Sequence, residues 1–418
     1  MNRLRQFWHA AAKLFDLPRR LRAVRDRRTD PQIPVPVLTT SLLLGAVLRV
    51  PSFLQLEAET RRAGWQRLIG WSKAISDDAF AYGLEHARLE DLRALLVAVN
   101  QTLKRNKALE AAKINGLLVV ALDGNEQFNS RARCCAACCQ RQVKVTDDAG
   151  QLVEVTEYYH RQVYAQLHGP NLSIILDLEP IGPGEEEAAA ALRLLGRMRR
   201  LYGPRFFDAV TVDAWYAKGP FVKAVQRLGW GVVAVLKQER YEIYQEATTL
   251  TKGQASQDYQ WQGRTVQLWE AKDLSFTDDA IGPMRVVLAE EQWKEVQRVG
   301  GRKEVKDKRG SWRWLVSQEL DPYSAQVIWQ IGHQRWGVEN HAFNELTQHY
   351  HLEHCPHHHP VAIMAWLLIL VLAFNLFEWF SRLHGKLCTL GHSTLQEIAR
   401  QLFLALARWE ELEPLWSG

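Results

Sequence analysis

Residues 117–124 read LLVVALDG, a run of six apolar residues that ends at Asp123 and Gly124. An unbroken apolar run of this length, closed by a turn-forming pair, is typical of a strand that is buried on both faces. We therefore expect a short strand here, with the carboxylate of Asp123 at its tip. A side chain in that position is held by a rigid element and points to the edge of the sheet.

The chain that follows this strand alternates between strand and helix patterns. Strands are predicted at 157–166, 172–178, 206–212 and 231–236, and helices at 185–201 and 219–228. The first three strands come in succession, which indicates an antiparallel meander. The acids Glu185, Glu186 and Glu187 suit the start of a helix dipole. The strand at 206–212 ends at a second aspartate, Asp213, so the pattern predicts an α/β sheet with two carboxylates at one edge.

Composition and charge are those of a globular protein of two or three domains. The chain has 418 residues, 47% of them hydrophobic, and a formal net charge of +5. Nine Lys and Arg side chains lie between Arg3 and Arg28, opposed by two aspartates. Such an arm attracts phosphate backbones, although a solvated terminus has the same composition. We find no signal-peptide pattern and only a few clustered cysteines, so we expect a protein of the reducing cytoplasm.

The regions on either side of the predicted sheet differ in their patterns. Residues 1–113 are helical in pattern, and we assign them to DNA binding and dimerisation. Residues 237–320 carry strand patterns separated by turns at 300–301 and 306–310. Helical character returns afterwards. The chain is therefore expected to have an N-terminal helical domain (1–113), a core in two parts (114–236 and 321–418) and a β-rich insertion (237–320).

A third acid, Glu339, lies in a helical pattern after the insertion. Taken alone, Glu339 could be an ordinary solvent-exposed residue of a helix. In the same way, Asp123-Gly124 taken alone could be a common turn. Carboxylates that gather in one place repel one another unless a cation offsets their charge. Oxygen ligands favour Mg²⁺ or Mn²⁺ over Zn²⁺. Two such ions, about 3.5–4 Å apart, would activate a water or a 3′-hydroxyl and stabilise a leaving oxygen.

Three stretches together resemble a known family. They are Leu122-Asp123-Gly124, VDAWY at 212–216 and HQRWGVEN at 333–340. They are similar to the DDE transposases of bacterial insertion sequences, in particular the group whose RNase H-like core is interrupted by a β-strand insertion before the final glutamate. The resemblance covers about residues 116 to 380. The gap between the second and third acids (339 − 213 = 126 positions) matches such an insertion.

The resemblance implies a fold, an activity and a site. The fold is an RNase H-like core of the retroviral-integrase type, and the activity is metal-dependent cleavage and strand transfer at the ends of an insertion sequence. Asp123, Asp213 and Glu339 match the triad that binds two Mg²⁺ or Mn²⁺ ions. Arg335, one helical turn before Glu339, matches an arginine aimed at a phosphate. The partners are double-stranded DNA, as terminal repeats and target, and a second copy of the chain on paired ends.

The sequence departs from that family at two positions. The family's tyrosine before the arginine is Gly332 here, and its lysine after the glutamate is Leu346. Phosphate contacts would then pass to other side chains, namely Asn344, His349, His351 or His354. Trp336 either stacks on a flipped base or lies in the core. The same residues fit a nuclease that cuts without joining, or an inactive DNA-binding relic of a transposase.

Cysteines and histidines form two further clusters. Cys134, Cys135, Cys138 and Cys139 make a CCxxCC motif, in which Cys135 and Cys138 have the spacing of a zinc half-site. A second half would be needed, and His160 is the nearby candidate; otherwise these are reduced, partly buried cysteines. The residues His354, Cys355 and His357 to His359 are expected to form a polar loop before a core helix rather than a metal site.

The run from Val361 to Phe374 is apolar without interruption and approaches the length of a membrane span. Asn375 and Glu378 interrupt its continuation. We find no second run of similar quality. We therefore expect a helix buried on all sides in a large core, with a membrane protein as the alternative.

Overall fold

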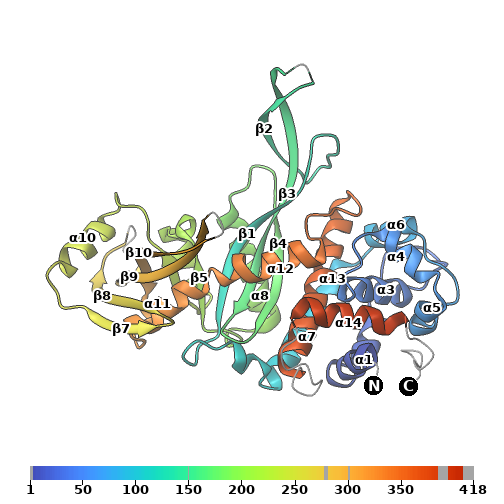
Figure 1. Ribbon diagram of the computed structural model, residues 1–418, viewed down its shortest axis with the longest axis horizontal. Helices are drawn as coiled ribbons and strands as arrows, with labels where there is room; N and C mark the ends of the chain where they lie inside the picture. The colour runs from blue at the N-terminus through green and yellow to red at the C-terminus, as the bar shows by residue number, and fades with distance from the viewer. Residues whose placement is uncertain (1–2, 149, 277–280, 300–301, 385–393, 408–418) are drawn as a thin grey trace.

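The computed structural model describes residues 3–148, 150–276, 281–299, 302–384 and 394–407. Its strands form one mixed, ten-stranded sheet that runs through the middle of the molecule (Figure 1). The order along the sheet is β2-β3-β1-β5-β6-β10-β9-β8-β7, and β4 also pairs with β3. The strands are β1 (Val119–Ser130), β2 (Cys139–Thr146), β3 (Leu152–His168), β4 (Ser173–Ile181), β5 (Ala209–Val212), β6 (Gly231–Val235), β7 (Gln257–Trp261), β8 (Arg264–Leu274), β9 (Met284–Val299) and β10 (Arg302–Ser317).

Five of these strands form the centre of the sheet, in the order β4-β3-β1-β5-β6. The pairs β1–β3 and β3–β4 are antiparallel, whereas β1–β5 and β5–β6 are parallel. The predicted meander of three strands is therefore confirmed. Residues from β1 and β5, such as Val120 and Val210, are fully buried, which accounts for the apolar runs that predicted them.

The outer ends of β1 and β3 extend well beyond this centre and, together with β2, form an arm that projects from the molecule (Figure 1). The sequence did not predict β2, nor the length of β1. Alternation of exposed and half-buried residues along β2 shows that much of the arm faces solvent. The arm thus lacks the buried, apolar run by which the central strands were found.

The insertion extends the same sheet instead of forming a separate one. β10 pairs antiparallel with β6 through Trp314↔Val235 and its neighbours, and β9, β8 and β7 follow outward. The turn expected at 306–310 is wrong. Lys306 to Gly310 lie inside β10 and pair with residues 291–295 of β9, because charged side chains are accommodated on the exposed sides of this long hairpin.

Helices cover the sheet and form a separate group at its β4 side. They are α1 (Arg3–Phe15), α2 (Leu17–Ala23), α3 (Val35–Val47), α4 (Phe53–Thr60), α5 (Ala63–Ile69), α6 (Asp77–Glu85), α7 (Leu89–Arg105), α8 (Glu187–Tyr202), α9 (Gly219–Arg227), α10 (Glu242–Thr251), α11 (Ala325–Gln334), α12 (Asn344–Tyr350), α13 (Pro360–Trp379) and α14 (Leu395–Ala407). The helical character expected of the first 113 residues is confirmed by α1 to α7.

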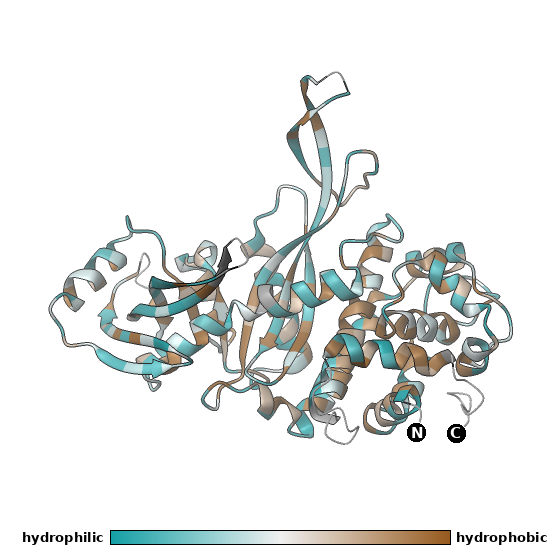
Figure 2. Cartoon of the chain, viewed as in Figure 1, coloured by the Kyte–Doolittle hydropathy of each residue, from teal (hydrophilic) through white to brown (hydrophobic). Residues whose placement is uncertain are grey.

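The apolar run expected to be a core helix is α13. It packs against α3, α6, α7 and β4, and Figure 2 shows hydrophobic ribbon in α13 and in the helices beside it. Among the described residues, the segment Pro360–Arg382 is the one helix long and apolar enough to cross a membrane, and 89% of its most apolar window is buried within the protein. A helix that is apolar on all sides and covered by other parts of the protein is a core helix, as the sequence predicted.

Asn375, which interrupts the apolar run, fastens α13 to β4. Its Oδ1 accepts a hydrogen bond from the backbone N–H of Ile175 at 2.9 Å, and its Nδ2 donates to the carbonyl of the same residue at 2.7 Å. The Nδ2 also donates to Asn100 Oδ1 on α7 at 3.0 Å. All three residues are buried, so water cannot reach these polar groups, and the Asn375 amide supplies their hydrogen-bond partners instead.

We expect Asn375→Leu to lower the free energy of unfolding by about 2–4 kcal/mol, because the Ile175 N–H would be left buried without its acceptor. Urea denaturation followed by circular dichroism measures this. Leu372→Met in the same helix is the control, and its cost should stay below about 1.5 kcal/mol. Equal unfolding midpoints for the two variants would contradict the assigned role.

Candidate active site and metal centre

Asp123 lies in β1, and Asp213 directly follows β5, the parallel neighbour of β1. The register of β1 and β5 pairs Val119 with Ala209 and Ala121 with Thr211. Asp213 directly follows Val212, the last residue of β5. The charges of Asp123 and Asp213 both raise the pKa of Tyr216, so the two carboxylates lie near the same hydroxyl.

Asp123 is not at the tip of its strand, as was expected. β1 continues through Gly124, and Asp123 and Gly124 pair with Tyr164 and Val163 of β3. The Asp-Gly pair is therefore strand rather than turn, because the partner strand β3 runs on beyond it into the arm. On the other side β5 ends at Val212, which leaves the pair of carboxylates at the open end of β5.

Backbone hydrogen bonds fix the direction of both carboxylates. Asp123 Oδ1 accepts from the N–H of Gly124 at 3.0 Å, and Asp213 Oδ1 accepts from the N–H of Trp215 at 2.8 Å. Asp213 thereby caps a short 3₁₀ turn, Ala214–Tyr216. Each acid is thus held by the segment that directly follows it in the chain.

Arg335 reaches this pair from the end of α11. Its Nη1 lies 3.7 Å from Asp123 Oδ2, and the side chains are 7% and 15% exposed. A guanidinium this close to a largely buried carboxylate offsets part of its charge. The site thus joins α11, from beyond the insertion, to the first strand of the sheet.

Glu187, at the start of α8, is an acid that lies beside Gly124, the residue after Asp123. Its Oε2 is so close to Gly124 that a Cβ on that glycine would lie 2.3 Å from it. Arg161 Nη2 donates to Oε2 at 2.5 Å, and the hydroxyl of Tyr216 donates to Oε1 at 2.6 Å. Burial raises the pKa of Tyr216, and the charges of Glu187, Asp123 and Asp213 raise it further. Tyr216 therefore stays protonated between these carboxylates and donates its hydrogen bond.

Trp215 is an exposed aromatic side chain beside Asp213. It is 58% exposed, and the Lys218 ammonium lies 4.9 Å from its ring centroid. The sequence drew attention to Trp336, which was expected either to stack on a base or to lie in the core. Trp336 is half-buried, with its ring edge-on to Trp312 at 4.5 Å, and it lines a cavity of about 870 Å³ together with Arg264. The exposure of Trp215 could not be predicted from the sequence.

The other residues expected to contact phosphate lie on and after α12. Asn344 is exposed at the start of that helix. His351 follows its end and faces the loop between α3 and α4, where it lines a cavity with Arg49 and His349. The structure therefore places His351 near the N-terminal helices and does not bring it together with Arg335.

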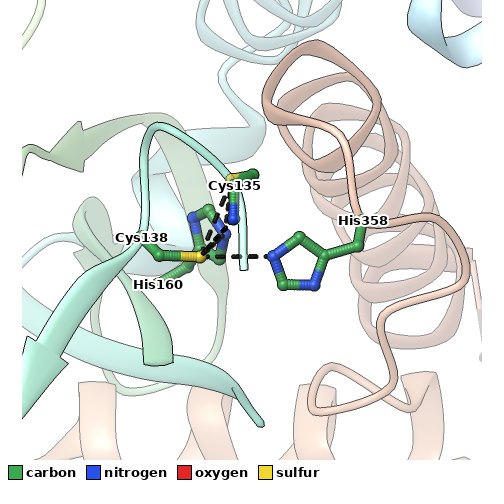
Figure 3. A group of neighbouring side chains, drawn as sticks. All are labelled: Cys135, Cys138, His160 and His358. Atoms are coloured by element: carbon green, nitrogen blue, oxygen red, sulfur yellow. Dashed lines mark hydrogen bonds between the residues drawn. The ribbon is translucent and has the colours of Figure 1, made fainter. Parts of the chain in front are cut away.

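The CxxC motif meets two histidines (Figure 3). Cys135 and Cys138 lie in the loop between β1 and β2, His160 lies in β3, and His358 lies just before α13. Their four ligand atoms all lie within 4.8 Å of one another. Burial lowers the pKa of His160 to about 4, so this imidazole is neutral near pH 7. Residues 354–359 form the expected loop before α13, and the structure in addition brings His358 beside the two cysteines.

The outer cysteines of the motif do not join this group. Cys134 is exposed, and the Sγ of Cys139 is turned to the carbonyls of Ile181 and Gly182 at 3.7 and 3.8 Å. The sequence showed the CxxC spacing and His160. His358 was missed because it is 220 positions from Cys138 along the chain and comes near only through the packing of α13.

Comparison with known proteins finds a family that matches part of this chain. Residues 170–376 match the family described as the transposase DDE domain. This chain carries a transposase DDE domain. The match includes Asp213, Arg335 and Glu339, and it begins after β1, so Asp123 lies outside the matched region, on a strand that pairs with β5. The resemblance to DDE transposases is thus confirmed for residues 170–376, which include the motifs at 212–216 and 333–340.

Solved structures and curated proteins were also compared. One similar structure is the piggyBac transposase synaptic complex with hairpin DNA, at 12% sequence identity and a TM-score of 0.40. The alignment covers 97% of this chain and 79% of that chain. No curated protein matches the sequence.

Glu339 lies in a distorted helical segment of the DDE domain. Val338–Phe343 forms a π-helix between α11 and α12, and this segment packs against β1. The Glu339 side chain is outside the described part of the structure. Regular helical spacing from Arg335 to Glu339 was expected and is wrong, because α11 ends at Gln334 and the chain turns before the π-helix begins. Such π-segments are frequent at functional sites.

Proposed function

We propose that this chain is a transposase that cleaves DNA at the ends of an insertion sequence and transfers the cut strands to target DNA. The proposal is supported by the parallel pairing of β1, which contains Asp123, with β5, which Asp213 directly follows, and by the ion pair of Arg335 with Asp123. Two carboxylates fixed by backbone hydrogen bonds at one open strand end are suited to holding cations against a phosphodiester.

The centre of the sheet supports an RNase H-like core for this activity. Three antiparallel strands followed by two parallel ones, in the order β4-β3-β1-β5-β6, agree with the fold that the sequence resemblance implied. The helical region 1–113 would then bind the terminal repeats, and 237–320 would be the insertion within the core. A homodimer on paired DNA ends and a cytoplasmic, nucleoid-associated location belong to the same proposal.

The donor atoms at the site fit Mg²⁺ or Mn²⁺. Asp123 and Asp213 offer carboxylate oxygens without a sulfur ligand, and the triad is proposed to be completed by Glu339. Two bound ions would supply the activation of the attacking hydroxyl and the stabilisation of the leaving oxygen. Glu187, engaged by Arg161 and Tyr216, would act by positioning β1 and the Ala214–Tyr216 turn.

Side chains around the carboxylates would hold the DNA. Arg335 is suited to orient a phosphate beside Asp123, since a guanidinium can contact two phosphate oxygens at once. Trp215, exposed next to Asp213, offers a face on which a base can stack. Asn344 remains a proposed phosphate contact, because it is exposed.

The test is an assay of the full chain with linear DNA that carries the inverted repeats flanking its gene, in the presence of Mg²⁺. We expect cleavage at the repeat ends and products joined to a second DNA. Cleavage without joined products would assign a nuclease, and binding without cleavage would assign an inactive relic. Either result would overturn the proposal.

A further inference from the structure

A closed group of metal-ligand atoms lies outside the carboxylate site (Figure 3). It consists of Cys135 and Cys138 from the loop after β1, His160 from β3 and His358 from the loop before α13. We propose that these four side chains bind one Zn²⁺ ion in a tetrahedral structural site. Two thiolates and two imidazoles without an open position are the donor set of structural zinc centres.

The distances between the ligand atoms agree with a tetrahedron around zinc. Zn–S bonds of about 2.3 Å and Zn–N bonds of about 2.0–2.1 Å place two sulfurs about 3.8 Å apart and a sulfur and a nitrogen about 3.6 Å apart. The two Sγ atoms are 3.7 Å apart. His160 Nε2 lies 3.5 and 3.3 Å from them, and His358 Nε2 lies 3.2 Å from the Sγ of Cys138. Only small shifts are needed to place an ion at the centre.

The loop is shaped to present the two sulfurs. The N–H of Cys138 donates to the carbonyl of Cys135 at 3.1 Å, which closes a turn. The N–H of Cys135 donates to the Sγ of Cys138 at 3.2 Å, so this sulfur accepts, as a thiolate ligand does. Cys138 and His160 are 2% and 5% exposed, which keeps water from half of the site.

The site would join three parts of the protein that are far apart in sequence. His160 pairs with Gln127 of β1, four residues after Asp123. His358 stands next to His357, whose Nε2 lies 2.6 Å from Glu85 Oε1 on α6. The ion would thus fasten the base of the arm to α13 and to the N-terminal helices. Its role is structural and does not depend on the proposed reaction.

The zinc content of the full chain, purified under reducing conditions and measured by mass spectrometry, tests the proposal. We expect about one Zn²⁺ per chain, and at least about a fivefold lower content in Cys138→Ser and in His358→Ala. Cys134→Ser is the matched control, because Cys134 is the exposed neighbour outside the group, and it should keep its zinc. Zinc-free wild-type protein, or equal loss in Cys134→Ser, would overturn the proposal.

Cobalt spectroscopy keeps the test decisive if a variant fails to fold. Co²⁺ bound to the wild-type chain should give the visible absorption of a tetrahedral site with thiolate-to-cobalt charge transfer. His358→Cys should retain the metal and strengthen the charge-transfer band, because a third sulfur replaces a nitrogen. An octahedral spectrum in the wild type, or a spectrum unchanged by His358→Cys, would show that these residues are not the ligands. Both readouts are independent of transposition.

Discussion

Replacing Asp213 with Asn should lower the rate of DNA cleavage by about 10³-fold while leaving DNA binding intact. The substitution removes the negative charge that would hold a cation with Asp123. The Oδ1 of Asn can still accept the hydrogen bond from the Trp215 N–H, so the turn that follows β5 should keep its form. Single-turnover cleavage of end-bearing DNA in Mg²⁺, beside a gel-shift assay, measures both effects.

Asp208 provides the matched control at the other end of β5. Its Oδ2 accepts a hydrogen bond from the Leu118 N–H at 2.8 Å, which an Asn side chain can also do. Asp208→Asn should therefore cleave DNA at the wild-type rate. A fully active Asp213→Asn variant, or an equal loss of cleavage activity in both variants, would show that Asp213 is not part of the active site.

Arg335→Lys should lower cleavage by about 10²-fold, because lysine keeps the charge beside Asp123 but not the planar fork that grips a phosphate. The side chain is only 7% exposed, so a loss of stability is also expected, and the midpoint of thermal unfolding must be measured with the rate. Affinity measured against salt concentration in Arg335→Gln, which removes the charge, separates the two roles. A lost phosphate contact lowers the slope by about one, whereas a purely internal ion pair leaves it unchanged.

Arg93→Lys controls for the loss of a buried arginine as such. Arg93 pairs with Asp177 at 3.0 Å, and both side chains are buried, at 13% and 0% exposed. This pair lies between α7 and β4, so its variant should lose stability without losing cleavage. If Arg335→Lys behaves in the same way, Arg335 acts on the fold and not on the DNA.

Local patterns in the sequence were enough to predict the central strands and two of the acids. The run at 117–122 and the strand before Asp213 are buried on both faces, and burial of that kind leaves a continuous apolar signal. The arm carries no such signal, so β2 and the extension of β1 past Asp123 were not predicted. The turn expected at 306–310 failed for a related reason, since charge and glycine indicated a loop where long pairing with β9 holds a strand.

Residues that the sequence did not predict to lie at the two sites come there through contacts between distant segments of the chain. Glu187 was assigned to a helix dipole, and its approach to Gly124 depends on how α8 lies on the sheet. His358 reaches Cys138 only because α13 is packed beside the base of the arm. The prediction for Glu339 rests on the family motif and on the contact of its segment with β1.

The unbroken pairing of β1 with β3 has a mechanical consequence. From Asp123 to Gln127 every residue of β1 has a partner on β3, and the first irregularity comes after Gln127. A paired strand of this kind does not bend easily, so it behaves as a stiff rod with an acid near one end and the Cys/His group near the other. The projecting hairpin joins this segment beyond the irregularity, so whatever immobilises the Cys/His group, which includes the partner of Gln127, steadies Asp123 as well.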